Sequence, residues 1–165
     1  MNKLLLVDGY SIMYRSHFAY AGRTMLTSPD GTPTGAISGF FNSLFSVVDE
    51  YKPTHICVCF DVHAPTFRHK LSSDYKATRK PMPDELRVQM PILKDILDLM
   101  GIARVEKETF EADDLIGTLS RMGEEEGDEV FAENIVLTPQ PQISLSIQDQ
   151  STGYVLALVG GRGVK

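Results

Sequence analysis

Apolar residues occur in short runs and in helical repeats that alternate along most of the chain. Residues 3–8 (KLLLVD) and 55–61 (HICVCFD) are short, mostly apolar runs, which predict two buried β-strands. Residues 103–110 (ARVEKETF) predict a third short strand or an extended connection. The first two runs end in Asp8 and Asp61, so each predicted strand finishes on a carboxylate.

Longer segments repeat apolar residues at the spacing of an α-helix. Residues 34–53 and 84–101 show this pattern, and residues 111–127 predict the next helix. Pro91 lies inside the second segment, so we expect a kink or two short helices there. Gly101 is expected to end that segment, because glycine readily adopts the left-handed conformation that closes a helix.

This alternation of strands and helices is typical of an α/β fold with a parallel sheet. We therefore predict a parallel-sheet, three-layer α/β core with right-handed crossovers. Residues 19–36 and 62–83 are too long for plain connections, and long loops in compact domains are often functional.

The last part of the chain differs in character from the rest. From about residue 131 it has few charges and much Gln, Ser and Gly. Residues 142–159 predict a β-hairpin around QSTG, with Gly153 in the left-handed turn position. We expect an α/β domain over residues 1–128 and a β-hairpin tail over residues 129–165.

Composition excludes several classes of protein. Hydrophobic residues make up 42% and charged residues 23%, which is ordinary for a globular protein, and no apolar run approaches the roughly 18 residues of a membrane span. Cys57 and Cys59 are expected to be buried thiols on one strand of a cytoplasmic protein. The sequence shows no Walker or GxGxxG motif, and no Ser–His–Asp or Cys–His arrangement is recognisable.

The charge distribution is uneven, although the net charge of −6 does not by itself suggest a nucleic-acid binder. Residues 68–80 carry five basic residues and one acid, so this window is +4 and the remainder is −10. Such a segment indicates an element that faces phosphate, and Tyr75 offers a ring on which a base could stack. A solvated, charged helix remains the alternative. The basic residues are Arg68, Lys70, Lys76, Arg79 and Lys80.

Acidic residues stand where a parallel sheet would gather them. Asp8 and Asp61 end two strands, and Glu111, Asp113 and Asp114 begin a helix. Because sites in open parallel sheets form at the carboxyl ends of strands, the five carboxylates could converge there. They would repel one another unless a divalent cation compensated, and hard oxygen ligands suit Mg²⁺ or Mn²⁺. The alternatives are favourable helix-dipole interactions for the triplet and turn or cap roles for the two aspartates.

An acidic metal patch beside a basic strip suggests phosphodiester chemistry. Bound metal ions would generate hydroxide, hold the scissile phosphate and stabilise the leaving oxygen. The basic strip would follow the nucleic-acid backbone.

At this point four stretches of residues 1–128 resemble a known family. LLLVDGYSIMYRSHFA, TSPDGTPTGAISGFFNSL, FDVHAPTFRHKLSSDYKATRKPMPDELRVQMP and FEADDLIGTLSRM are similar to the N-terminal 5′-nuclease domains of bacterial DNA polymerases of type I, part of the flap endonuclease/PIN-like group. The resemblance implies Mg²⁺-dependent 5′→3′ exonuclease and flap endonuclease activity on DNA, in replication and repair. No membrane and no defined protein partner is implied.

The same resemblance assigns roles to individual residues. It implies that the metal-site acids are Asp8, Asp61, Glu111, Asp113 and Asp114. It implies that Tyr75, Lys76 and Arg79 belong to a helical arch that grips the 5′ strand, with Arg68 nearby and Lys80 in the same basic segment.

The chain departs from the family after residue 127. The family continues into a strand that ends in a motif like TGDRD, whose aspartates complete a second metal position, whereas this chain reads NIVLTPQPQ. We therefore expect impaired activity and a missing sheet strand, which residues 134–138 could replace. The tail resembles the start of a penicillin-binding protein transpeptidase domain without its catalytic motifs. Three hypotheses remain: an impaired 5′-nuclease, a non-catalytic DNA-binding module, and a cell-wall transpeptidase fragment.

Overall fold

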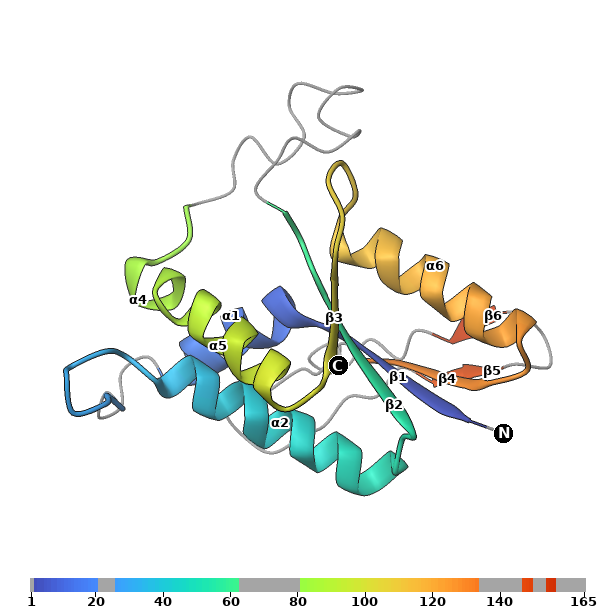
Figure 1. The fold of residues 1–165 in the computed structure, drawn as a ribbon, viewed down its shortest axis with the longest axis horizontal. Helices are drawn as coiled ribbons and strands as arrows, with labels where there is room; N and C mark the ends of the chain where they lie inside the picture. The colour runs from blue at the N-terminus through green and yellow to red at the C-terminus, as the bar shows by residue number, and fades with distance from the viewer. Residues whose placement is uncertain (1, 21–25, 63–80, 134–146, 150–153, 157–165) are drawn as a thin grey trace, which may run out of the picture.

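A six-stranded sheet forms the centre of the protein (Figure 1). The computed structural model describes residues 2–20, 26–62, 81–133, 147–149 and 154–156. Four strands run parallel, and the last two join them in antiparallel pairing. In spatial order, the strands are β3 (Ala103–Glu106), β2 (His55–Phe60), β1 (Lys3–Asp8), β4 (Glu129–Glu133), β5 (Ile147–Asp149) and β6 (Tyr154–Leu156).

Helices cover both faces of the parallel part of the sheet (Figure 1). One face packs against α1 (Gly9–Tyr20), α2 (Gly35–Tyr51), α4 (Asp84–Arg87) and α5 (Gln89–Leu99), and the other packs against α6 (Ala112–Glu125). This arrangement confirms the predicted three-layer α/β core with a parallel sheet.

The alternation of side chains along β1 explains the two layers. Leu5 and Val7 belong to the larger apolar cluster with α1, α2 and α5, while Leu6, between them, belongs to the cluster beneath α6. All three side chains are fully buried, as expected for a central parallel strand covered on both faces. Cys57 and Cys59 are free and buried beneath α6, which confirms the prediction of two buried thiols.

The predicted segment 84–101 forms two helices, but the break is not at Pro91. Val88 separates α4 from α5, and Pro91 is the third residue of α5. Proline is tolerated in a first helical turn, because its missing N–H would lack an intrahelical acceptor there. Gly101 has φ 70° and follows the end of α5, so its expected role in ending the helix is confirmed.

Gln89 joins α5 to the start of α2. Its buried Oε1 accepts hydrogen bonds from the N–H groups of Ala36 (3.0 Å) and Ile37 (3.2 Å), and its Nε2 donates to the carbonyl of Glu85 at 2.7 Å. These amides lack an intrahelical acceptor in the first turn of α2. A side chain distant in sequence therefore caps this helix, whereas Thr34 makes no side-chain cap hydrogen bond.

Helix α1 and strand β4 were not predicted. Strand β4 pairs in parallel with β1, so the expectation that the sheet lacks this strand is wrong. The strand lies at residues 129–133, directly before the 134–138 segment proposed to add there, and that segment is outside the described residues. The strand has only three consecutive apolar residues between two glutamates, and this run is too short to predict a strand by itself.

The predicted C-terminal hairpin is present as β5 and β6. Ile147 pairs with Leu156 and Asp149 with Tyr154, in antiparallel register, while Gly153 lies outside the described residues. The boundary near residue 128 stays a prediction. In the described part of the chain, no helix is both long enough and apolar enough to cross a membrane.

Candidate functional site

A cleft of about 360 Å³ lies where β1 and β2 end and α6 begins. Asp8 is the last residue of β1, Asp61 directly follows β2, and Glu111 directly precedes α6. The parallel sheet therefore brings together acids that are far apart in the sequence. The cleft is lined by Asp8, Tyr10, Ser11, Tyr14, Arg15, Asp61, Glu111 and Asp113.

Asp8 lies in a desolvated part of the cleft, close to two other acids. Burial raises the pKa of its carboxyl from 3.8 to about 6, and the nearby charges of Asp113 and Asp61 act in the same direction. The N–H of Ser11 donates to Asp8 Oδ1 at 2.9 Å, and this hydrogen bond, like the charge of Arg15, opposes the increase. A cation in the cleft would offset both the desolvation cost of the charged Asp8 carboxylate and its repulsion by the other acids.

Asp61 ties the end of β2 to the start of α6. Its Oδ1 accepts a hydrogen bond of 2.7 Å from the N–H of Ala112, the first residue of that helix. The carboxylate thus satisfies an amide without an intrahelical acceptor and interacts favourably with the positive end of the helix dipole. The turn or cap role considered for this residue is therefore real, and Asp61 also lines the cleft.

Two of the three acids at the start of α6 line the cleft, and the third caps the helix. Glu111 and Asp113 line the cleft, and Glu111 is 7% exposed. Asp114 turns back toward the backbone, where its Oδ2 accepts a hydrogen bond of 3.0 Å from the N–H of Glu111. Asp114 is not among the residues that line the cleft. Its observed role is that of a capping residue, and its metal role stays a prediction.

The chemistry of the cleft fits a hard divalent cation. Four carboxylates line one hollow, and Asp8 is desolvated beside two other acids. As the side chains stand, no three His, Cys, Asp or Glu residues of the described ranges converge closely enough to enclose a metal ion. Magnesium commonly uses one or two carboxylates and keeps several water molecules, so direct contact with every acid is not required.

The cleft also contains side chains that sequence reasoning missed. Tyr10, Ser11, Tyr14 and Arg15 come from α1, which the apolar pattern did not predict. Burial lowers the pKa of the Arg15 guanidinium, while the charge of Asp8 opposes that decrease. The sequence spacing could have identified three of these residues, because residues 11, 14 and 15 share one face of a helix that begins directly after Asp8.

The predicted DNA-binding residues cannot be compared with this cleft. They fall within residues 63–80, which lie outside the described part of the chain, and their roles stay predictions. They are Arg68, Tyr75, Lys76, Arg79 and Lys80.

Comparison with known proteins identifies a family. The family described as "5′-3′ exonuclease, N-terminal resolvase-like domain" matches residues 3–139. DNA polymerase I of Bacillus subtilis (strain 168) is 44% identical over 128 residues, which are 78% of this chain and 14% of that protein. DNA polymerase I of Geobacillus stearothermophilus is 42% identical over 126 residues, again 14% of its length. The chain therefore spans about one seventh of these relatives.

Solved structures support the fold. A T5 5′-exonuclease with bound zinc ions matches with a TM-score of 0.55 and 21% identity, covering 79% of this chain and 48% of the other. A bacteriophage T5 flap endonuclease, in a pseudo-enzyme–product complex with DNA and metal ions, matches with a TM-score of 0.52 and 19% identity, covering 79% and 47%. At this level of identity the likeness concerns the fold.

Proposed function

Because the chain belongs to the family of 5′-3′ exonuclease N-terminal, resolvase-like domains, we propose that it is a divalent-metal-dependent 5′-nuclease acting on DNA. The reaction is hydrolysis of a phosphodiester bond near a 5′ end or at a 5′ flap. The observation that carries this proposal is the cleft itself, in which acids from the ends of two strands and the start of α6 lie beside Arg15. The cellular setting would be DNA replication and repair in the cytoplasm.

The acids that line the cleft would hold Mg²⁺ or Mn²⁺. The carboxylates of Asp8 and Asp61 come from the ends of β1 and β2. Those of Glu111 and Asp113 come from the start of α6. A bound cation would neutralise phosphate charge and lower the pKa of a coordinated water. Both structures named above contain metal ions, which supports this assignment for a chain of the same fold.

Residues of α1 would position the substrate. The Arg15 guanidinium lines the same cleft as the acids, so it can hydrogen-bond a phosphate that enters. Tyr14 presents an aromatic side chain at the same place, suited to stacking on a base. The basic segment 68–80 would follow the DNA backbone, with Arg68, Tyr75, Lys76, Arg79 and Lys80 as its proposed contacts.

Cleavage by this chain is expected to be slow. Residues 134–141 read NIVLTPQP, where the family resemblance places two further metal-binding aspartates. In two-metal sites the ions stabilise both the attacking and the leaving oxygen, so loss of one position removes part of that stabilisation. The proposed activity is therefore that of an impaired nuclease.

A flap-cleavage assay tests the proposal. A labelled 5′-flap DNA is incubated with the chain in Mg²⁺ or Mn²⁺, in EDTA, and with Asp8→Asn. The matched control is Asp49→Asn, which removes one carboxylate from an exposed position on α2 that pairs with Lys52. Product is expected from the wild type and the control with metal, and not from Asp8→Asn or in EDTA. Equal cleavage by Asp8→Asn would refute the assignment.

A DNA-binding module without turnover is the second candidate. The observation in its favour is that no group of metal-enclosing side chains forms among the described residues. Flap DNA that binds in EDTA and remains intact in Mn²⁺ after long incubation would support it. The cell-wall hypothesis gains no support, because the family match covers residues 3–139 and describes a nuclease domain.

A further inference from the structure

Phe60 and Gly9 pack against each other, and each is the chain neighbour of one of the two strand-end aspartates. Phe60 precedes Asp61 in the chain, and Gly9 follows Asp8. The Phe60 side chain is fully buried, and a Cβ placed on Gly9 would lie within 2.6 Å of ring carbons Cδ1 and Cζ of Phe60. The ring therefore packs against the Gly9 backbone at a distance that no other residue type permits without a shift.

Two further contacts hold the same ring. Tyr10 meets Phe60 edge-to-face, with 5.9 Å between ring centroids and an interplanar angle of 81°. The Nζ of Lys94, on α5, lies 5.0 Å from the centroid of the Phe60 ring. Phe60 thus contacts the beginning of α1 and the middle of α5 at once.

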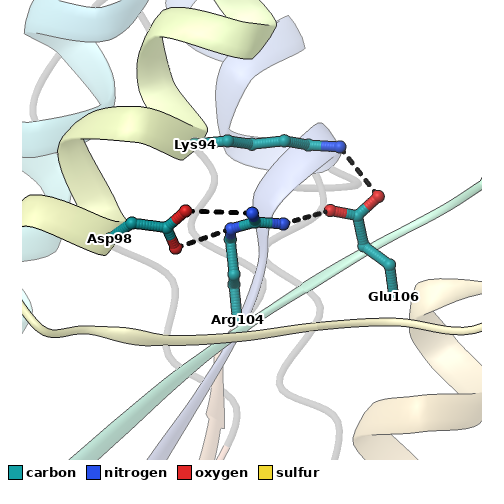
Figure 2. Close-up of polar contacts among 4 residues, drawn as sticks. All are labelled: Lys94, Asp98, Arg104 and Glu106. Carbon is teal, nitrogen blue, oxygen red and sulfur yellow. Dashed lines mark hydrogen bonds and ion pairs between the residues drawn. The ribbon is translucent and has the colours of Figure 1, made fainter.

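Lys94 is itself fixed by an ion-pair network, shown in Figure 2. Its Nζ lies 2.8 Å from Glu106 Oε2, and the other Glu106 oxygen lies 2.8 Å from Arg104 Nη1. Arg104 donates two hydrogen bonds to Asp98 on α5, of 2.7 Å and 2.9 Å. Lys94 and Glu106 side chains are only 22% and 24% exposed, so this pair is better shielded than an ordinary surface ion pair.

We propose that Phe60 is a positioning residue that sets the separation of the Asp8 and Asp61 carboxylates, and through it the affinity of the cleft for a divalent cation. This role rests on the function proposed above. Phe60 shares a peptide bond with Asp61, and its ring abuts the residue bonded to Asp8. A displacement of the ring moves one aspartate relative to the other, and metal or substrate sites tolerate only about 0.5 Å of such error.

The first test compares two buried aromatics. Phe60→Leu and Phe40→Leu each replace a fully buried phenylalanine of the same apolar cluster by a smaller side chain. Phe40, however, lies on α2 and packs against Phe41. Mn²⁺ alone is titrated into each variant and followed by electron paramagnetic resonance. Phe60→Leu is expected to weaken Mn²⁺ binding about tenfold, the scale of changes just outside a metal site, while Phe40→Leu binds as the wild type does. Equal effects would show a general loss of packing and overturn the proposal.

The second test uses the Gly9 contact and keeps the proposal falsifiable if Phe60→Leu does not fold. Gly9→Ala adds a methyl group where the ring lies and is expected to weaken Mn²⁺ binding. The double variant Gly9→Ala/Phe60→Leu frees space for that methyl group, so it is expected to bind more tightly than Gly9→Ala. Additive losses in the double variant would contradict a shared positioning role.

A direct structural measurement separates this proposal from the function on which it rests. Crystal structures of the metal-free wild type, Phe60→Leu and Phe40→Leu give the distance between the carboxyl carbons of Asp8 and Asp61. A change of about 0.5 Å or more is expected for Phe60→Leu alone. An unchanged distance overturns the positioning role. Failure of the wild type to bind Mn²⁺ instead overturns the proposed function and the metal-affinity consequence of the positioning role.

Discussion

The carboxylate of Asp61 accepts a 2.7 Å hydrogen bond from the N–H of Ala112, which lies 51 residues later in the chain. The bond joins the end of β2 to the first residue of α6. Because Glu111 and Asp113 flank Ala112, this one contact places the acids of the helix beside the acid of the strand. Asp61 therefore has a structural role and a proposed metal-binding role, and substitutions can separate them.

Asparagine and alanine at position 61 are expected to differ in stability but not in metal binding. Asp61→Asn keeps an oxygen that can accept from Ala112, whereas Asp61→Ala leaves that amide without its acceptor and should cost about 1 kcal/mol. Both remove a carboxylate and should weaken Mn²⁺ binding. Urea unfolding and Mn²⁺ titration of the two variants check this, and equal destabilisation by Asn and Ala would contradict the capping role.

The contribution of Asp8 to the stability of the metal-free protein should fall between about pH 4 and pH 6. The folded-state pKa of Asp8, about 6, exceeds its ordinary value of 3.8, so this carboxyl holds more protons in the folded state than in the unfolded state in this interval. Its contribution to stability therefore decreases as the pH rises, by up to about 3 kcal/mol, and the full loss remains above pH 6. Asp8→Asn should remove this contribution and be more stable than the wild type at pH 7. Chemical unfolding across the pH range in EDTA measures it.

The affinity for Mn²⁺ should decrease in acid. The Asp8 carboxyl must lose its proton to bind a cation, and its pKa of about 6 places that change close to neutrality. The apparent dissociation constant is expected to rise about tenfold per pH unit below 6 through this group. Titrations at pH 5 and pH 7.5 check the slope, and an affinity that does not change between them would exclude Asp8 as a ligand.

Arg15→Ala should weaken DNA binding without unfolding the protein. The guanidinium lines the cleft and is proposed to contact a phosphate, so its removal should reduce the slope of log affinity against log salt by about one. Arg15→Lys keeps the charge and is expected to retain that slope. Binding of flap DNA in EDTA at several salt concentrations measures both variants. An unchanged slope in Arg15→Ala would show that Arg15 does not contact phosphate.

Gln89→Leu should destabilise the fold by about 1–3 kcal/mol. The substitution leaves the N–H groups of Ala36 and Ile37 buried without an acceptor. The control is Asn42→Leu, at an exposed position of α2, the helix that contains Ala36 and Ile37. It should change stability little. Thermal and urea unfolding of the two variants give the comparison, and a loss in Gln89→Leu no larger than in the control would rule out this cap.

Much of the fold could be predicted from local pattern. Strands β1 and β2 correspond to predicted segments because each is a short, mostly apolar run, and helices α2 and α6 because their apolar residues repeat at helical spacing. Helix α1 escaped prediction because polar residues interrupt its apolar positions, and β4 because its apolar run is only three residues long, between two glutamates. The break at Val88 was displaced from Pro91, since proline fits the first turn of α5.

By itself, the sequence determined the α/β class, the ends of the central strands and the location of acids at those ends. Burial leaves an apolar run in a central strand and a helical repeat of apolar residues in a covering helix. Both patterns can be recognised without knowing which segments pack together. Only the tertiary structure decided that Asp114 caps α6 while Asp113 faces the cleft, and that Arg15 and Tyr14 join them. These outcomes depend on where one segment lies relative to another, and hydrogen bonds and burial between distant segments set that arrangement.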